Sequence, residues 1–168
     1  MKFFTQETLK PLQEKYEEYK ALLNAASSDP PSEPYKSKYA AFDILHEINE
    51  MLKTMQISDI EYQVHIEIIR CHVLLASGTL KSEVEEPSDA EKLLEGCLQK
   101  CSELTDPRLT VMVLVSAHNQ LGILWFNRED MEAAKTHLEQ ALTVFSVFKA
   151  DNTNNNFWTI DDLFYPAK

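Results

Sequence analysis

The chain has 168 residues, of which 44% are hydrophobic, and its 27 acidic and 16 basic residues give a formal net charge of −11. This length suits one domain with one sizeable core. The negative charge argues against nucleic acid or an anionic membrane as a partner and favours a basic protein surface. Only three glycines occur, so the backbone rarely needs a positive φ, and helix-forming residues fill most windows. We therefore expect an all-α fold.

Six segments have the apolar spacing of amphipathic helices. The first two cover about residues 6–26 and 39–52 and are separated by the turn-forming stretch 27–34. A third begins after Ser58, which can cap it, and ends before a polar loop at residues 78–87. A capping box at residues 88–91 opens the fourth helix. Asp106 and Pro107 open the fifth, which runs to Phe126, and the sixth covers residues 131–148.

These helices predict three antiparallel hairpins, at about residues 6–55, 58–104 and 106–150, stacked into a TPR-like α-solenoid over residues 1–150. Residues 151–168 are expected to form a polar linker and an aromatic-acidic C-terminal segment. A bare aromatic patch is unusual on a soluble chain, so three roles stay open for this segment. It is a cap folded back over the sixth helix, which we favour, a contact with further repeats, or a ligand for another protein.

The last hairpin has the pattern of a tetratricopeptide repeat, in which small residues stand where two helices cross closely and large ones fill the space between them. The residues at the packing positions are Leu121, Gly122, Trp125, Ala134, Leu138 and Ala141. The middle hairpin reads as a degenerate copy, with Ala90, Leu94 and Cys97 in its second helix. It has an enlarged loop before them and no close-packing glycine near Val73 and Leu74. The first hairpin has no repeat signature.

Stacked hairpins leave a concave face lined by the first helix of each pair, where a partner's helix or peptide can lie. The residues expected on this face of the last hairpin are Ser116, Asn119, Ile123, Phe126 and Asn127. The acidic residues of the expected loop, Glu83, Glu85 and Glu86, are candidates for charge display toward the partner. For each of these side chains, the alternative is that it only packs or faces water.

No motif for catalysis, a cofactor or a metal occurs in the sequence. The five histidines are scattered without the paired spacing of a zinc site, Cys97 and Cys101 supply only two ligands, and the three glycines are isolated. Three cysteines without a secretory segment favour the cytoplasm. No apolar run approaches the roughly 20 residues of a membrane span. We expect a non-enzymatic cytoplasmic protein without membrane insertion.

Two segments carry a resemblance to a known family. The first is Glu33-Pro34-Tyr35-Lys36-Ser37-Lys38-Tyr39, and the second is Asn119-Gln120-Leu121-Gly122-Ile123-Leu124-Trp125, followed by Arg128-Glu129-Asp130 and Ala133. They resemble the N-terminal part of the kinesin-binding protein family (KIF-binding proteins), and the similarity extends weakly over nearly the whole chain. The resemblance implies a cytoskeleton-associated TPR-like α-solenoid that binds the motor domains of selected kinesins and keeps them off microtubules. It also implies links to mitochondrial transport, axon growth and cytoskeletal organisation.

The charge agrees with that role, because the microtubule-facing surface of a motor domain is adapted to acidic tubulin and an acidic array can compete for it. Members of the family are several times longer than this chain. Two other interaction roles stay open: the end of a structural scaffold, or an isolated TPR adaptor that binds another protein's peptide or helix. A homo-oligomer also stays open, since an uncapped repeat end can pair with its own copy.

Overall fold

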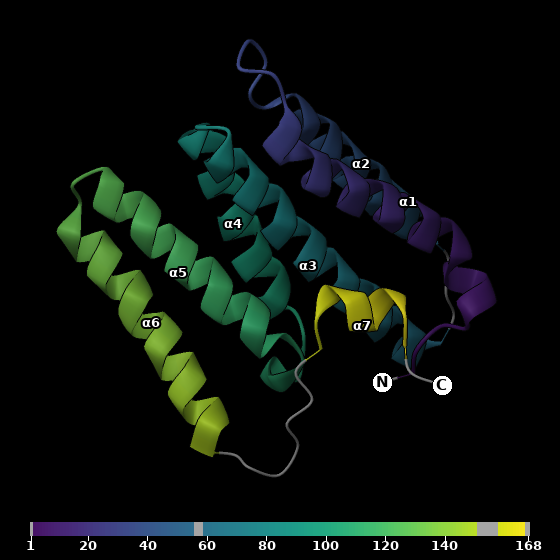
Figure 1. Cartoon of the computed structure of the whole chain (residues 1–168). Coiled ribbons are helices and arrows are strands. Elements are labelled where there is room, and N and C mark those ends of the chain that lie inside the picture. The colour runs from purple at the N-terminus through teal and green to yellow at the C-terminus, as the bar shows by residue number, and fades with distance from the viewer. Residues whose placement is uncertain (1, 56–58, 151–157, 167–168) are drawn as a thin grey trace.

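The computed structural model describes residues 2–55, 59–150 and 158–166. In these ranges it contains α-helices, two short 3₁₀ helices and no strand (Figure 1), which confirms the expected all-α class. The α-helices are α1 Gln6–Ala25, α2 Lys36–Thr54, α3 Ile60–Glu83, α4 Pro87–Ser102, α5 Val111–Asn127, α6 Met131–Ala150 and α7 Ile160–Phe164. The 3₁₀ helices are η1 Ala26–Ser28 and η2 Pro107–Thr110.

The helices stack in sequence order as an α-solenoid (Figure 1). α1 packs against α2, α3 against α4 and α5 against α6, while contacts of α2 with α3 and of α5 with both α3 and α4 join the neighbouring pairs. Buried residues of α1, α2, α3 and α7 form one hydrophobic cluster, and a second lies between α3, α4 and α5. Each pair therefore buries its apolar face against the next, as expected for a TPR-like array.

The helix starts follow from short polar side chains. The Asp59 carboxylate accepts a hydrogen bond from the Glu61 amide at 2.9 Å and caps α3, whereas Ser58, the expected cap, lies outside the described residues. Asp106 caps the segment that leads into α5, as predicted, but the first turn after Asp106 is the 3₁₀ helix η2. The expected capping box at residues 88–91 is wrong, because α4 already begins at Pro87, whose missing amide proton costs nothing in the first turn.

The polar loop expected at residues 78–87 is also wrong, since α3 continues to Glu83 and only three residues connect it to α4. Gly78 lies inside α3 and is buried against α4. A Cβ atom at this position would stand 2.8 Å from the Leu94 Cγ, closer than two carbon atoms can approach. Glycine therefore serves here to let the two helices cross at short distance rather than to end a helix.

The middle pair is a structural repeat of the last pair, offset by 44 residues. Gly122 meets Leu138 as Gly78 meets Leu94, with a Cβ atom at Gly122 standing 2.7 Å from the Leu138 side chain. The connecting turns also match, because Glu85 and Glu129 both have a φ of 63°. In each turn the next amide bonds back five residues, Glu86 to Lys81 and Asp130 to Trp125, at 2.9 and 3.0 Å. The expectation that the middle pair lacks a close-packing glycine is therefore wrong.

The C-terminal segment folds back onto the first and third helices, not over the sixth (Figure 1). Leu163 and Phe164 of α7 are fully buried, and the Phe164 ring stacks on Tyr16 with the centroids 4.4 Å apart. The His65 Nε2 lies 2.8 Å from the Leu163 carbonyl oxygen, which accepts its hydrogen bond. The favoured role as a cap is right in kind, but the helices that it covers are α1 and α3.

One stretch of the described chain, Pro107–Asn127, is long and apolar enough to cross a membrane, with a mean hydropathy of 1.4. The expectation that no apolar run approaches this length is therefore wrong. The stretch is also the central helix of the last two pairs, and Val113, Ala117 and Leu121 are at most 1% exposed in contacts with its neighbours. An apolar helix in this position is what packing on several sides requires.

Candidate protein-binding groove

A hollow of about 530 Å³ lies between the C-terminal halves of α3 and α5. Its walls come from the first helices of two successive pairs, which is where the repeat pattern predicts a concave face. The residues that line it are Thr79, Ser82, Glu83, Glu85, Pro87, Gln120, Ile123, Leu124, Asn127 and Arg128. From the sequence alone, most of these residues were expected in a loop or were given no role in binding a partner.

Two further hollows, of about 260 and 470 Å³, continue the first one along α3. The 260 Å³ hollow shares Thr79 and Glu83 with the first and reaches α1 at Tyr19 and Leu23. The 470 Å³ hollow lies nearer the N-terminus of α3 and is also lined by α5 residues such as Ser116. The 260 Å³ hollow also shares His72 and Leu75 with the 470 Å³ hollow, so it joins the other two into one groove, called here the concave groove, along α1, α3 and α5, with Phe145 of α6 at its lower end.

The concave groove brings together five of the eight predicted partner-binding residues. Ser116, Ile123 and Asn127 line it from α5, and Glu83 and Glu85 line it from the end of α3 and the turn after it. This juxtaposition joins two groups that the sequence placed on separate features, a helix face and a loop.

The other three predicted residues lie away from the groove lining. Asn119 and Phe126 are exposed on α5, and Phe126 is 58% exposed. The Glu86 carboxylate turns toward α3, where it accepts a hydrogen bond from the Lys81 ammonium at 2.9 Å. Among the expected packing residues, Leu121, Gly122, Ala134 and Ala141 are buried, and Leu138 contacts Gly122 yet remains 44% exposed.

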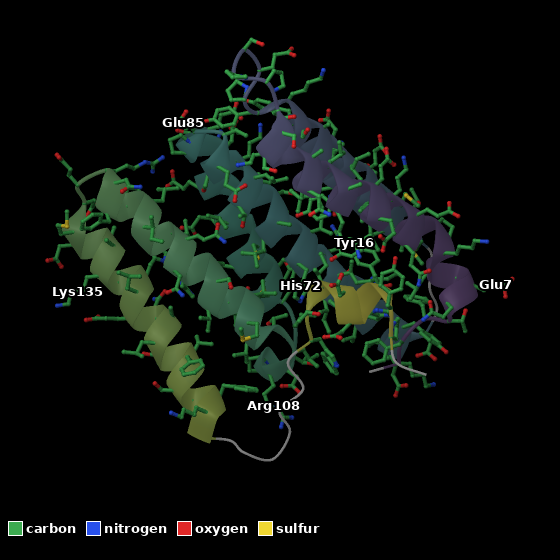
Figure 2. The ribbon with its side chains drawn as sticks, viewed as in Figure 1. Glu7, Tyr16, His72, Glu85, Arg108 and Lys135 are labelled. Carbon is green, nitrogen blue, oxygen red and sulfur yellow. The ribbon has the colours of Figure 1, made fainter. Side chains whose placement is uncertain are left out.

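The upper mouth of the groove is acidic, with Glu85 in the turn that follows α3 (Figure 2). The Glu85 carboxylate accepts a hydrogen bond from the Tyr35 hydroxyl at 2.7 Å, and this bond raises the pKa of Tyr35. Glu83 lies 3.5 Å from the Lys38 ammonium, and both side chains stay partly exposed. Partly exposed pairs of this kind contribute little stability, so the two carboxylates are available to an incoming cation.

Arg128 also lines this mouth, and its charge is already engaged. Its guanidinium lies 2.7 Å from the Glu91 carboxylate and 4.8 Å from the centre of the Trp125 ring. Its charge is therefore directed at α4 and at an aromatic face, and the groove offers a partner mainly negative charge at this end.

The floor of the groove carries a polar bridge that sequence reasoning missed. The Gln120 amide nitrogen donates to the Thr79 hydroxyl at 2.8 Å, and this links α5 to α3. The Thr79 hydroxyl also donates a hydrogen bond within α3 to the Leu75 carbonyl oxygen, 2.9 Å away. The sequence signal that locates Thr79 is the residue before it, Gly78. Gly78 stands twelve residues before Ala90, which is the spacing from Gly122 to Ala134.

The lower end of the groove is closed by the chain's own C-terminal segment. Trp158 and Ile160 line the hollow beside His72, and the Trp158 ring meets Phe3 edge-on at 5.6 Å between centroids. His72 lies between α5 and α7 in Figure 2 and is 8% exposed. Burial disfavours the charged imidazole and lowers the pKa of His72 to about 4, so this end of the groove is neutral and largely apolar.

The three cysteines lie together beneath the groove, where α3 meets α4. Cys71, Cys97 and Cys101 are buried and unpaired by disulfides, and the Cys97 thiol lies 3.4 Å from the Cys71 carbonyl. Within the described ranges, no group of three or more histidine, cysteine, aspartate or glutamate side chains is arranged to hold a metal ion. All three cysteines are buried in the cluster between α3, α4 and α5, where they serve as small core residues at a helix crossing.

Comparison with known proteins links this array to one family. The chain is 31% identical over 138 residues to KIF-binding protein from Gallus gallus, which covers 79% of the chain and 22% of that protein. It is 26% identical over 175 residues to the Danio rerio protein of the same name, covering 84% and 27%. It is 27% identical over 173 residues to the one from Drosophila melanogaster, covering 96% and 28%.

The chain is a relative of the KIF-binding proteins. It spans 22–28% of the length of these three relatives. No family model matches the chain, and no solved structure matches it. The similarity to KIF-binding proteins covers most of the helical array, and with it most of the residues that line the concave groove.

Proposed function

We propose that this chain is a non-enzymatic protein-interaction module that binds a kinesin motor domain in its concave groove. Binding keeps the motor off microtubules and so affects microtubule-based transport, including that of mitochondria, and the organisation of the cytoskeleton. The observation that carries the proposal is the continuous groove along α1, α3 and α5, acidic at its mouth, in a relative of the KIF-binding proteins. The proposed location is the cytoplasm, in association with the cytoskeleton.

Charge supports a motor domain as the partner. The surface with which a motor meets acidic tubulin must be basic, and Glu83 and Glu85 at the groove mouth present the complementary charge. The net charge of −11 adds a long-range attraction for such a surface. Attraction between exposed charges falls off over about 10 Å at 0.1 M salt, so binding should weaken as salt is added.

The apolar part of the groove supports a helix as the bound element. Ile123 is 57% exposed at the upper end, and Leu75 and Ile160 continue the apolar lining toward the lower end. A groove with an apolar floor and charged rim takes an amphipathic helix, whose apolar residues fill the floor while its polar face contacts the rim. The chain's own α7 packs against α1 and α3, and its Ile160 lines the lower end of the groove.

The test is co-sedimentation of kinesin motor domains with microtubules, at two salt concentrations, with and without this chain. We expect the chain to move the motor from the pellet to the supernatant at low salt and less so at high salt. The double substitution Glu83→Lys and Glu85→Lys should abolish this effect. The matched control carries the same charge change at Glu132 and Glu139, which are exposed on α6 outside the groove, and should act like the unmodified chain.

A second pair of variants tests the apolar floor. Ile123→Asp should weaken motor release about tenfold, because it places a charge in the desolvated part of the interface, whereas Val147→Asp, at a 67% exposed site on α6, should not. Loss of motor release in the Glu132→Lys, Glu139→Lys control would show that net charge rather than the groove is responsible, and loss in Val147→Asp would show that the apolar floor is not the binding surface.

An unchanged pellet with the unmodified chain would refute motor displacement. The alternative is then an adaptor or scaffold end that binds another protein's helix without inhibiting a motor. The open groove favours this alternative as a second candidate, because its apolar floor can pack against the apolar face of any amphipathic helix. Motor binding without release from microtubules, measured in the same pellets, would support it.

A further inference from the structure

Two histidines meet where α5 packs against α6. The Nδ1 atoms of His118 and His137 lie 3.1 Å apart, and the two ring centroids are 5.4 Å apart. Both residues are half-buried. A hydrogen bond between two Nδ1 atoms needs one proton between them, so one ring donates and the other accepts. This contact is called here the histidine pair.

The histidine pair stands where the middle pair of helices has two leucines. With the repeat offset of 44 residues, His118 corresponds to Leu74 of α3 and His137 to Leu93 of α4. Both leucines are half-buried, and Leu74 packs against the cluster between α3, α4 and α5. The same helix crossing is therefore built once from apolar side chains and once from titratable ones, so the crossing itself does not require histidine.

The charged surroundings of the histidine pair come from α4. The Glu95 carboxylate lies 3.8 Å from the His137 Nε2. It favours a proton on that nitrogen, which leaves the His137 Nδ1 as the acceptor and makes His118 the donor. Burial and then the charge of His137 lower the pKa of His118, while Cys101 of α4 opposes them more weakly. Among the described residues, Glu95 and Cys101 are the titratable groups that act on the pair from another helix.

The histidine pair can keep its hydrogen bond with one added proton but not with two. A charged His137 ring, next to Glu95, still donates its Nδ1 proton to a neutral His118 ring. A second added proton puts a hydrogen on both Nδ1 atoms, so two donors and two positive charges face each other. The hydrogen bond is then lost, and the like charges repel each other in a half-buried contact.

Few deeply buried side chains hold α6 in place. In the described part of the chain, its buried hydrophobic residues are Ala134, Ala141 and Phe148, and two of these are small. Leu138 and Leu142 are 44% and 65% exposed. Segments that bury little apolar surface open locally at a low cost in free energy, so a repulsion between α5 and α6 should act mainly on α6.

We propose that the histidine pair is a proton-sensitive latch that fastens α6 to α5. The latch is closed while one proton lies between the two Nδ1 atoms, and it opens when both rings are charged, which loosens α6. A histidine whose charged form is disfavoured in the folded chain contributes stability that is complete above its unfolded pKa of about 6.5 and declines as the pH falls. The latch is therefore closed at neutral pH and opens progressively below about pH 6.5.

The test is amide hydrogen exchange of the full chain, measured by mass spectrometry at pH 7.5 and 5.5. Protection of the α6 peptides is corrected for the intrinsic exchange rate at each pH. In the open state His118 has an ordinary pKa of about 6.5, and its protonation favours opening by about tenfold at pH 5.5. We therefore expect the protection of α6 to fall by about tenfold more than it does in a chain without the histidine pair.

That chain carries His118→Leu and His137→Leu, which copy the leucines of the middle pair of helices. His65 and His72, whose pKa values are also lowered by burial, are present in both chains, so their effect on exchange cancels in the comparison. The matched control is His46→Gln, which removes an exposed histidine of α2 and should behave like the unmodified chain. Circular dichroism melting curves verify that the variants fold.

Two results of the exchange experiment overturn the proposal. One is an equal fall in α6 protection in the unmodified chain and in the H118L/H137L variant. The other is loss of the pH dependence in His46→Gln as well. Nuclear magnetic resonance titration of the imidazole rings tests the latch without any substitution. Protons shared in the pair should be taken up in two separate steps, whereas independent titration of both rings near pH 6.5 would show that no latch exists.

Discussion

The three glycines should respond in three different ways to replacement by alanine. In the interior of a helix this change is favourable by about 0.5–1 kcal/mol, because alanine loses less backbone entropy on folding. Opposing it is any clash of the new Cβ atom, which costs about 1–3 kcal/mol in a well-packed core. The environment of each glycine decides which effect is larger.

At Gly96 nothing lies within 4 Å of the added Cβ atom, so Gly96→Ala should stabilise the protein by about 0.5–1 kcal/mol. At Gly78 the Cβ atom would stand 2.8 Å from Leu94, which is 0% exposed and has no room to move. Gly78→Ala should therefore destabilise by about 1–2 kcal/mol. At Gly122 the contact is as short, but Leu138 is 44% exposed and can rotate into solvent, so Gly122→Ala should stay within about 0.5 kcal/mol of the unmodified chain.

Urea unfolding followed by circular dichroism measures these differences. Thermal melts should separate Gly96→Ala from Gly78→Ala by roughly 5–10 °C, since 1 kcal/mol shifts a domain of this size by about 2–4 °C. In a chain that also carries Leu94→Ala, the Gly78→Ala change should become stabilising, because the atom that it meets has been removed. A Gly78→Ala variant as stable as Gly96→Ala would refute the close crossing of α3 and α4.

Three other predictions concern single features of the fold, each read from urea unfolding. Phe164→Ala should lower the free energy of unfolding by about 3–5 kcal/mol, because Phe164 is 0% exposed. Tyr165→Ala should lower it by only about 1 kcal/mol, because Tyr165 is 37% exposed. Equal losses in the two variants would place α7 outside the core. Burial lowers the pKa of His72 to about 4, so the unfolded chain protonates first, and stability that is complete above about pH 6.5 should decline as the pH falls toward 4. His72→Gln should reduce this decline, and an unchanged pH profile would contradict it. Glu129→Gly should stabilise by about 0.5–1 kcal/mol, since its φ of 63° is left-handed, whereas Glu139→Gly inside α6 should cost about 1 kcal/mol; a loss in both would reject the shared turn geometry.

Local sequence pattern predicted the last hairpin nearly in full. Gly122, Trp125, Ala134 and Ala141 stand at repeat spacing, and the helices α5 and α6 have the expected places. The same pattern failed one repeat earlier. Gly78 lies among weak helix formers, and local propensity ends a helix there, but the packing of Leu94 against Gly78 carries α3 a further turn and a half to Glu83.

That error also separated residues of the concave groove. With α3 ended too early, Glu83 and Glu85 were assigned to a loop, while Ile123 and Asn127 were assigned to a helix face. Aligning residues 78–101 with residues 122–145 would have revealed the correspondence, since glycine is followed by alanine twelve residues later in both. Leu80, Leu94 and Leu98 also align with Leu124, Leu138 and Leu142, and these few identical positions carry the alignment.

Composition and apolar period were sufficient to determine an all-α array of stacked hairpins, because each helix needs only its own residues to form its backbone hydrogen bonds and its apolar face. The position of the C-terminal segment was beyond the reach of the sequence. Its aromatic residues fit any apolar surface, and only the folded chain brings Tyr16 and His65 to Phe164 and Leu163, about 100 residues or more along the chain. Tertiary structure alone therefore decided where α7 lies, how long the concave groove is, and that His118 meets His137, because each depends on contacts between helices rather than within them.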